Sequence, residues 1–364
     1  MKIKKAISFV MAVVLLFSVG MSVFASDNSE VKRGSMKIIN MNVDGLPIPS
    51  FLSSVKKSPI ASANAIIDFL NGYDADLVMM QENFGLYPYY QKKLAYDNIT
   101  GFVGGTGVGD GLGIASKYSL YNVKHIPWDT ACGILNCGSD ELTPKGFMVA
   151  TAEIADGVYI DVYTIHADAN EDDGSLKAKV EQFDQLCDYI DTYSKDRAVI
   201  VTGDFNSNFT LVLGDVLREK FVACGFKDTW VEVCNDGNYN FTYDEMYEKY
   251  HTDYWGHYDG LEKMFYRGTD TLTLEAKSHE YVFCTVENTE GQTVNAADHA
   301  ASVVEMTYTV TETKTPDTPL EKEQAMSVTE LCEKAVKYLF KALKLIISQI
   351  PGLIKGDIDI GWGK

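Results

Sequence analysis

Polar side chains that could bind a metal ion or move a proton lie at the ends of several apolar segments of the chain. Carboxylate and amide oxygens are the ligands that Mg²⁺ prefers, and no cysteine–histidine spacing typical of zinc competes with them. Histidine can take a proton from water, and a second donor can face the charge that develops when a phosphodiester is cleaved. Each motif alone is more often a turn or a solvated carboxylate, so the prediction rests on the set. The set comprises Asn42, Gln81-Glu82, Asp140 with Lys145, His166, Asp204 with Asn206, and Asp298-His299.

Short apolar strands that alternate with helices would position these residues at strand ends. Apolar spacing predicts helices over residues 62–70 and 176–193. Alternation of this kind predicts an α/β fold with two packed sheets flanked by helices. The predicted strands cover residues 36–41, 77–80, 113–116, 147–154, 158–165, 198–202, 261–266 and 301–310.

Three segments are predicted after the start of the fold. A catalytic domain spans residues 36–310, and residues 311–325, rich in Thr, Pro, Glu and Lys, form a linker. Residues 326–352 carry apolar side chains at helical spacing with lysines between them, and Pro351-Gly352 is expected to stop this helix. The pattern predicts an amphipathic helix that either lies in a membrane interface or packs on the domain or on a second copy.

The first 25 residues have the composition of a secretory signal peptide. Lys2, Lys4 and Lys5 precede an apolar run over residues 6–24, and Ala25 ends a small-residue cleavage site. The alternative is an uncleaved membrane anchor, which would normally need a longer apolar run. We therefore expect a secreted, extracellular protein that associates with membranes if its C-terminal helix binds lipid.

The chain of 364 residues is acidic, with 32 Lys and Arg against 51 Asp and Glu and a net charge of −19. This balance argues against a broad basic surface, so nucleic acid is the less favoured partner. It is compatible with a polyanionic substrate held through a divalent cation, because the cation supplies local positive charge. The hydrophobic share of 46% is enough for one large or two modest domains.

The sequence contains seven cysteines. In an oxidising compartment the short separations favour Cys132 with Cys137 and Cys224 with Cys234 as disulfide pairs. The odd number leaves at least one thiol free or paired with another molecule.

The order of the polar motifs resembles the endonuclease/exonuclease/phosphatase superfamily. Residues 110–117 and 140–147 are also typical of it, and the resemblance covers residues 36–310. An Asp five residues before Lys145-Gly146-Phe147 resembles the bacterial and neutral sphingomyelinases more than the nucleases, and Gly45-Leu46-Pro47 favours the same group. The resemblance implies a deoxyribonuclease-I-like four-layer sandwich of two mixed sheets flanked by helices, here with an added C-terminal amphipathic helix. It also implies a phosphodiesterase that uses Mg²⁺, or another divalent cation such as Mn²⁺ or Co²⁺.

The resemblance also implies roles for the residues that bind metal and activate water. Glu82 would be the principal metal ligand, with Asn42 beside it. Asp204 would orient the attacking water, and His299 would be the general base. Asp298 would fix the tautomer of His299 or help to hold the metal.

Other residues would act on the phosphoryl group. The resemblance implies that Asn206 and His166 bind phosphoryl oxygens, while Asp140 and Lys145 form a pair that closes the site over the substrate. Lys145 also has a direct use, because its positive charge can face a phosphate.

The chain departs from the family at the carboxylate that supports the catalytic histidine. The family usually has Asp in the strand before the Asp-His motif, whereas this chain has Glu262 there and Asp259 three residues earlier. An added methylene shifts a carboxylate by ~1.5 Å, which can weaken a positioned hydrogen bond. Either residue could supply the support.

We expect sphingomyelin or a related phospholipid at a membrane surface as substrate, with ceramide and phosphocholine as products. A choline group binds to aromatic faces, and tyrosines crowd into residues 239–258, although such a segment can equally serve packing alone. One alternative keeps the fold and makes the protein a nuclease or a phosphoinositide phosphatase. Another is a membrane-binding toxin or adhesion module with a vestigial site.

Overall fold

The computed structural model describes residues 31–46, 55–103, 109–134, 137–252, 257–316 and 318–355. The predicted signal peptide and Pro47 lie outside these residues. The strands are β1 (Lys32–Asn42), β2 (Leu77–Gln81), β3 (Asn98–Ile99), β4 (Gly113–Ser116), β5 (Ser119–Pro127), β6 (Gly146–Ala155), β7 (Val158–His166), β8 (Ala198–Asp204), β9 (Lys227–Asp228), β10 (Glu262–Arg267), β11 (Leu272–Val282), β12 (Thr285–Glu287), β13 (Thr293–Asn295) and β14 (Ala301–Val310).

The helices include the two that the apolar spacing predicts, and both are longer than predicted. Helix α2 begins after Ser58, whose side chain caps it, and α4 begins after the capping residue Asp172. The α-helices are α2 (Pro59–Tyr73), α3 (Tyr87–Lys93), α4 (Asp173–Tyr193), α5 (Gly214–Leu217), α6 (Thr229–Cys234), α7 (Tyr243–Tyr250) and α8 (Val328–Lys355).

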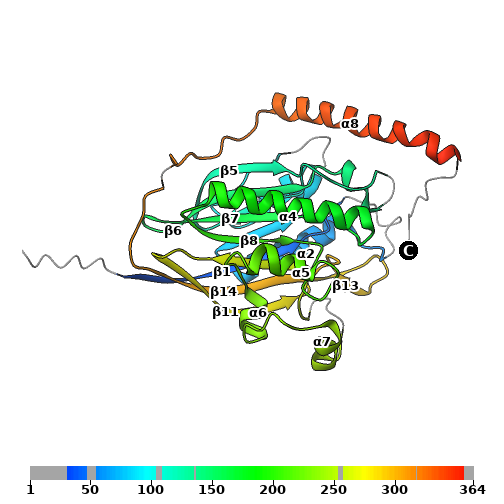
Figure 1. Cartoon of the computed structure of the whole chain (residues 1–364). Coiled ribbons are helices and arrows are strands. Elements are labelled where there is room, and N and C mark those ends of the chain that lie inside the picture. Colours follow the sequence, from blue (N-terminus) through cyan, green and yellow to red (C-terminus); the bar gives the residue numbers. More distant parts are fainter. Residues whose placement is uncertain are drawn as a thin grey trace, which may run out of the picture.

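Two six-stranded sheets form the centre of the molecule (Figure 1). The first has the order β11-β14-β1-β2-β4-β3, and the second has the order β5-β6-β7-β8-β10-β9. Strands β1 and β2 are parallel, as are β7 and β8, and the other pairs are antiparallel. Both sheets are therefore mixed, which confirms the predicted fold class.

Three apolar clusters separate four layers. Ile38 and Met79 of the first sheet face Ile160 and Ile200 of the second in the central cluster. Helix α2 packs on the outer face of the first sheet, and α4 packs on the outer face of the second (Figure 1). Residues that alternate along a strand point to opposite faces, so both sheets can be covered on both sides.

Strand β11 is the longest element that the sequence pattern does not predict. Leu272, Leu274 and Ala276 face inward, but the register shifts between Ala276 and Ser278. A bulge of this kind reverses which face the following residues occupy, so the apolar alternation is interrupted.

The C-terminal helix α8 differs from its prediction at one end. Ser327 and Glu330 cap its start with reciprocal hydrogen bonds, but the helix does not stop at Pro351 and continues to Lys355. A proline removes one backbone hydrogen bond, and so late in a helix that loss does not break the earlier turns. Among the described residues, no helix is both long and apolar enough to cross a bilayer.

The predicted linker is attached to the domain at two points. Glu321 exchanges backbone and side-chain hydrogen bonds with Asn122, and a carboxylate oxygen of Glu323 accepts from the Gly101 amide at 2.7 Å. These contacts place the second half of the linker along the edge of the sheets.

The cysteines do not form the second predicted pair. Cys224 and Cys234 are separate thiols, and their sulfur atoms contact the carbonyl oxygens of Glu219 and His279. The pairing of Cys132 with Cys137 lies outside the described residues, because the side chain of Cys137 is not described.

Candidate active site

The site lies where strands of both sheets end beside one another. In the first sheet, Asn42 at the end of β1 is in register with Gln81 at the end of β2. In the second, His166 at the end of β7 is in register with Asp204 at the end of β8, and Glu262 at the start of β10 faces the same Asp204. Strand register therefore gathers residues that are far apart in the sequence.

Two glycines allow the backbone to pass close to these strand ends. Gly203 has a φ of 148°, and a Cβ there would lie 2.1 Å from the carbonyl oxygen of Ile165. A Cβ on Gly45 would lie 2.3 Å from the carbonyl oxygen of Glu82, which accepts the Gly45 amide. Only glycine fits at these contacts, and both are next to predicted site residues.

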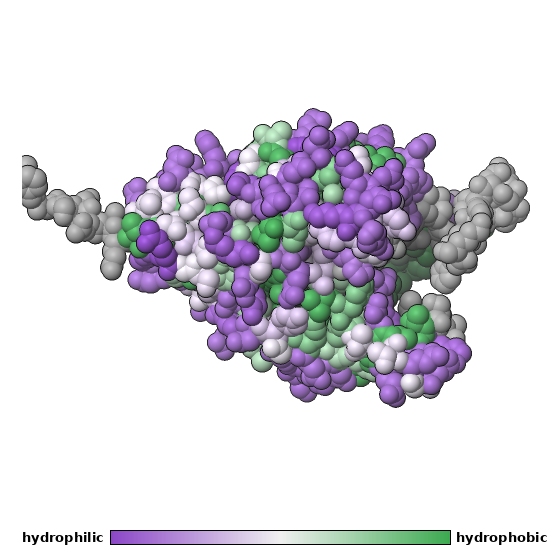
Figure 2. Space-filling model, turned by 90° about the horizontal axis from the view of Figure 1, so that it is seen from below, coloured by the Kyte–Doolittle hydropathy of each residue, from purple (hydrophilic) through white to green (hydrophobic). Residues whose placement is uncertain are grey.

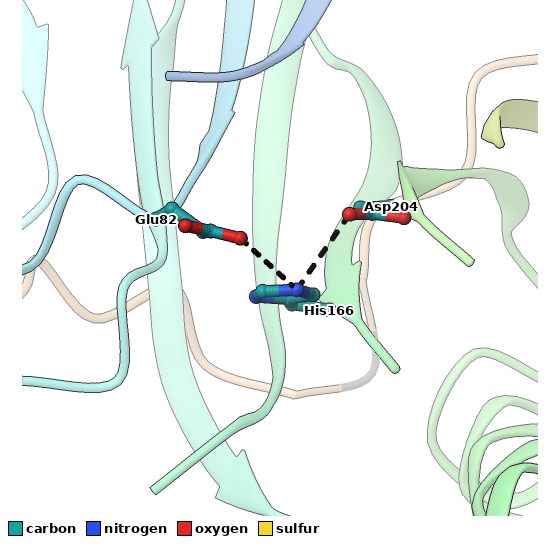
Figure 3. Close-up of side chains that lie close together, drawn as sticks. All are labelled: Glu82, His166 and Asp204. Carbon is teal, nitrogen blue, oxygen red and sulfur yellow. Dashed lines mark ion pairs between the residues drawn. The ribbon is translucent and has the colours of Figure 1, made fainter. Parts of the chain in front are cut away.

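Glu82, His166 and Asp204 point toward one another (Figure 3). The Nε2 atom of His166 lies 3.7 Å from a Glu82 oxygen and 3.6 Å from an Asp204 oxygen. The Asn42 side-chain amide donates to both carboxylates, at 2.9 Å to Glu82 beside it in the first sheet and at 3.0 Å to Asp204 of the second. One ligand atom from each of the three residues lies within 4.8 Å of the others, which is a spacing that could hold a metal ion.

His299 approaches the same Asp204 from the loop before β14. Its Nδ1 atom hydrogen-bonds to Glu262, and its Nε2 atom lies 3.9 Å from Asp204. The neighbouring Asp298 is largely exposed and lies 4.0 Å from Nε2. The carboxylate that orients the imidazole is therefore Glu262, and Asp298 is not placed to fix its tautomer.

Asp259, the other candidate for supporting His299, faces a different part of the core. Its carboxylate lies 2.5 Å from the buried Lys263 ammonium group and accepts the amides of Phe209 and Thr210 at 3.2 and 3.0 Å. This fully buried ion pair holds the loop after β8, so Asp259 serves the fold beside the site.

Asp140 and Lys145 form a buried ion pair with 2.6 Å between oxygen and nitrogen. The Lys145 ammonium group also donates to the Ala167 carbonyl at 3.2 Å, and Asp140 accepts the Ala169 amide at 2.9 Å. Both residues are therefore attached to the segment that follows His166. The structure brings the predicted pair to the edge of the strand-end cluster.

Asn206 adopts a left-handed backbone conformation with a φ of 45°. Its backbone amide donates to Asp204 at 2.8 Å, and its side-chain amide donates to the Ala167 carbonyl at 3.1 Å. The side chain is therefore near the cluster but directed at backbone, so binding a phosphoryl oxygen would require it to exchange that contact.

Lys179 of α4 is a positioning residue that the sequence analysis misses. It is 1% exposed and donates to the carbonyl oxygens of Asn170 and Asn206 at 2.7 and 2.8 Å. The sequence does contain an indication of this burial, because Lys179 stands four residues before Phe183 on the buried side of the predicted helix. A lysine in such a row must have buried partners.

Burial and neighbouring charges shift the pKa values across the site. Burial raises the pKa of Glu82 to about 7, although the Asn42 hydrogen bond acts against it. Burial and the charge of Lys145 hold the pKa of His166 well below its usual value. Burial acts to lower the pKa of His299, but Glu262 and Asp204 outweigh it and raise that pKa to about 11.

The donor set fits a hard divalent cation. Glu82 and Asp204 bring carboxylate oxygens together from two sheets, and positive charge between them would relieve the desolvation that raises the pKa of Glu82. The same charge would oppose the carboxylates that keep His299 protonated.

Asn42 fits a role as metal ligand less directly, because its amide oxygen accepts the Asp44 amide at 3.0 Å and its nitrogen faces the carboxylates. As a ligand, Asn42 would have to turn its amide over.

The tyrosine-rich segment divides between packing and exposure. Tyr258 is fully buried and stacks on Tyr250, with ring centroids 5.2 Å apart. Tyr243 and Tyr247 of α7 stack on each other and are exposed. Residues 253–256 lie outside the described residues. Packing therefore accounts for Tyr250 and Tyr258.

Comparisons with known proteins find relatives of this chain. The model of the Endonuclease/Exonuclease/phosphatase family matches residues 39–256. A sphingomyelinase of Mycobacterium tuberculosis is 27% identical over 295 residues, which cover 76% of this chain and 53% of that protein. The chain thus spans about half the length of the curated relatives it matches.

Solved structures share the fold at lower identity. TDP2 of D. rerio complexed with a single-strand DNA product has a TM-score of 0.55 at 17% identity, covering 75% of this chain and 99% of that one. Sphingomyelinase C of Streptomyces griseocarneus has a TM-score of 0.52 at 16% identity, covering 75% and 99%. A beta toxin mutant of Staphylococcus aureus with bound magnesium ions has a TM-score of 0.50 at 17% identity, covering 74% and 99%.

Proposed function

Because the chain belongs to the endonuclease/exonuclease/phosphatase family, we propose that it is a divalent-metal-dependent phosphodiesterase that hydrolyses sphingomyelin to ceramide and phosphocholine. The mycobacterial sphingomyelinase relative and the sphingomyelinase C fold support this substrate class. The magnesium ions of the beta toxin structure and the paired carboxylates Glu82 and Asp204 support the metal. The observation that supports the proposal is the convergence of three carboxylates and two histidines where strands of the two sheets begin and end.

In this proposal His299 in its neutral form takes the proton of the attacking water. A cation held by Glu82 and Asp204 would favour that form, because its charge would oppose the carboxylates that raise the pKa of His299. Glu262 holds its Nδ1 side, so Nε2 is the atom that faces Asp204 and the cluster. Asp204 lies between the two imidazoles, where its carboxylate can orient the water toward phosphorus. As the new O–P bond forms, the bond from phosphorus to the ceramide oxygen breaks, and that oxygen takes a proton from solvent so that ceramide leaves as the alcohol.

The remaining residues would bind the phosphoryl group. A cation held by Glu82 and Asp204 would supply positive charge against the oxygens of the transition state. The Lys145 ammonium group has a further N–H beyond its contacts with Asp140 and Ala167, and that N–H can donate to a substrate oxygen. His166 is held neutral by burial, so it can present a neutral donor to the same group.

Hydrolysis of labelled sphingomyelin in vesicles tests the proposal. We expect ceramide release with Mg²⁺, loss of release with EDTA, and loss in Glu82→Gln. Glu287→Gln, a change of an exposed glutamate on β12, is the matched control and should retain activity. Absence of ceramide release from correctly folded protein with Mg²⁺ would refute the substrate assignment.

Nucleic acid is the second candidate substrate, favoured by the fold shared with TDP2. The net charge of −19 weighs against it, because phosphate backbones bind to basic surfaces. Labelled single-stranded DNA offered under the same conditions distinguishes the two. Cleavage of DNA without release of ceramide would replace the first candidate with the second.

We also propose that the protein is secreted, on the basis of the lysines and apolar run within residues 1–25. Mass spectrometry of the protein from culture medium should find an N-terminus at Ser26. Full-length chain retained in the cell membrane would contradict this proposal.

A further inference from the structure

Helix α8 lies outside the four layers, beside β5 (Figure 1). A row of its apolar side chains is exposed. Phe340 is 68% exposed and Ile347 is 61% exposed. Positions three, four and seven residues apart lie on one side of a helix, so these side chains form one continuous stripe. We call this stripe the outer face of α8; it comprises Val336, Leu339, Phe340, Leu343, Ile346, Ile347 and Ile350.

A different side of α8 already contacts the domain. Tyr338 donates its hydroxyl hydrogen to the Leu142 carbonyl, and Leu331, Ala335 and Leu345 are half-buried on the same side of the helix. The outer face is therefore not the side that packs on the protein. An apolar stripe of this length that remains exposed marks an interaction surface.

The charge next to the outer face favours one kind of partner. Residues 334–350 contain four lysines and no acidic residue, in a chain whose net charge is −19. Lys334, Lys337 and Lys341 are exposed and line a cavity of about 340 Å³ between α8 and the domain. Lysines on the polar side of an amphipathic helix interact with anionic headgroups while the apolar side enters the acyl region.

We propose that the outer face of α8 docks on a phospholipid bilayer that contains anionic lipid. The opposite face of the molecule shows mainly hydrophilic residues, with apolar residues in small separate groups (Figure 2). Helix α8 thus combines the apolar outer face with lysines on another side of the same helix.

Docking through α8 would also serve the active site, and this step rests on the proposed function. Leu142 lies between Asp140 and Lys145, so the Tyr338 contact joins the lipid-binding helix to the segment that carries the buried ion pair.

Cosedimentation of the full chain with vesicles tests the proposal. The vesicles contain phosphatidylcholine with or without phosphatidylserine and no sphingomyelin. We expect binding that requires phosphatidylserine, and an apparent affinity about tenfold lower in the double variant Phe340→Ser, Ile347→Ser. Ile60→Ser removes an exposed apolar side chain from α2 and is the matched control, with unchanged binding.

Two further measurements separate the outcomes. Hydrolysis of a soluble phosphocholine ester should be equal in the wild type and the double variant. If the protein binds vesicles but hydrolyses neither the ester nor sphingomyelin, the proposed membrane docking is supported and the proposed function is refuted. Unchanged vesicle binding by the double variant would overturn the docking, and a simultaneous change from dimer to monomer in light scattering would identify a second copy as the occupant.

Discussion

The strand-end cluster and helix α8 are built in opposite ways. The cluster collects buried, polar side chains from β1, β7, β8 and β10, and each depends on the pairing of strands far apart in the sequence. Helix α8 is one continuous segment whose exposed apolar side follows from local spacing alone. In our two proposals, the chemistry therefore depends on the packing of the sheets, whereas the lipid contact depends on an appended element. Changes in the two regions should therefore have separable effects.

The largest expected effect is that of His299→Gln. Removal of the proposed general base should lower kcat by about 10³-fold on both vesicle and soluble substrates. His257→Gln alters an exposed histidine and is the control. Steady-state kinetics on both substrates, with thermal unfolding to verify folding, checks the prediction. If His299→Gln lost activity on vesicles but not on the soluble substrate, the proposed separation of roles between the strand-end cluster and α8 would be wrong.

Glu262→Gln should have the next largest effect, about 10²-fold on kcat. Glu262 and Asp204 raise the pKa of His299, so removal of the Glu262 charge should lower that pKa. In a plot of kcat against pH, the fall of kcat on the acid side should accordingly move to lower pH. Asp259→Asn, which removes the charge paired with Lys263, should reduce stability and leave that fall unmoved. If Glu262→Gln and Asp259→Asn shift the acid side of the pH dependence of kcat equally, Asp259 also acts on His299.

Metal binding should depend on pH through Glu82. Its pKa is raised to about 7, so a cation must displace a proton below that pH. Apparent Mg²⁺ affinity should rise about tenfold per pH unit below 7 and level off above it. Isothermal titration calorimetry in buffers of different ionisation enthalpy measures the released proton. Affinity that does not vary between pH 5 and about pH 7 would contradict this role for Glu82.

The same raised pKa affects stability in the metal-free protein. Between its ordinary value and about 7, the folded carboxyl keeps a proton that the unfolded chain has lost. The free energy of unfolding should therefore fall as pH rises through this window, and it should fall less in Glu82→Gln. Chemical denaturation in EDTA at a series of pH values provides the comparison.

The smallest expected effect belongs to removal of α8. A chain that ends at Gln324 keeps the contacts of Glu321 and Glu323 with the domain. It should lose several-fold activity on vesicles and none on a soluble phosphocholine ester. If the truncated chain is as active as the full chain on both substrates, α8 does not contact lipid. If the truncated chain loses activity on both substrates, α8 supports the Lys145 segment.

Local residue patterns predict most of the longer elements and the residue types at the candidate site. Apolar alternation and helical spacing indicate β14, α4 and α8, because a side chain's face depends on its neighbours along the chain. The polar residues at strand ends predict metal and phosphate chemistry, but the sequence does not predict the distances between their side chains. Strand β11 escapes the pattern because a bulge reverses its alternation.

Which side chains meet depends on how elements that are distant in the sequence pair and pack. Glu262 rather than Asp259 contacts His299, because register places Glu262 opposite Asp204 while Asp259 pairs with Lys263. Lys179 reaches the carbonyl of Asn206 because α4 packs over the end of β8. Local sequence sets the face of each element, but contacts between elements depend on register and packing, which long-range interactions determine.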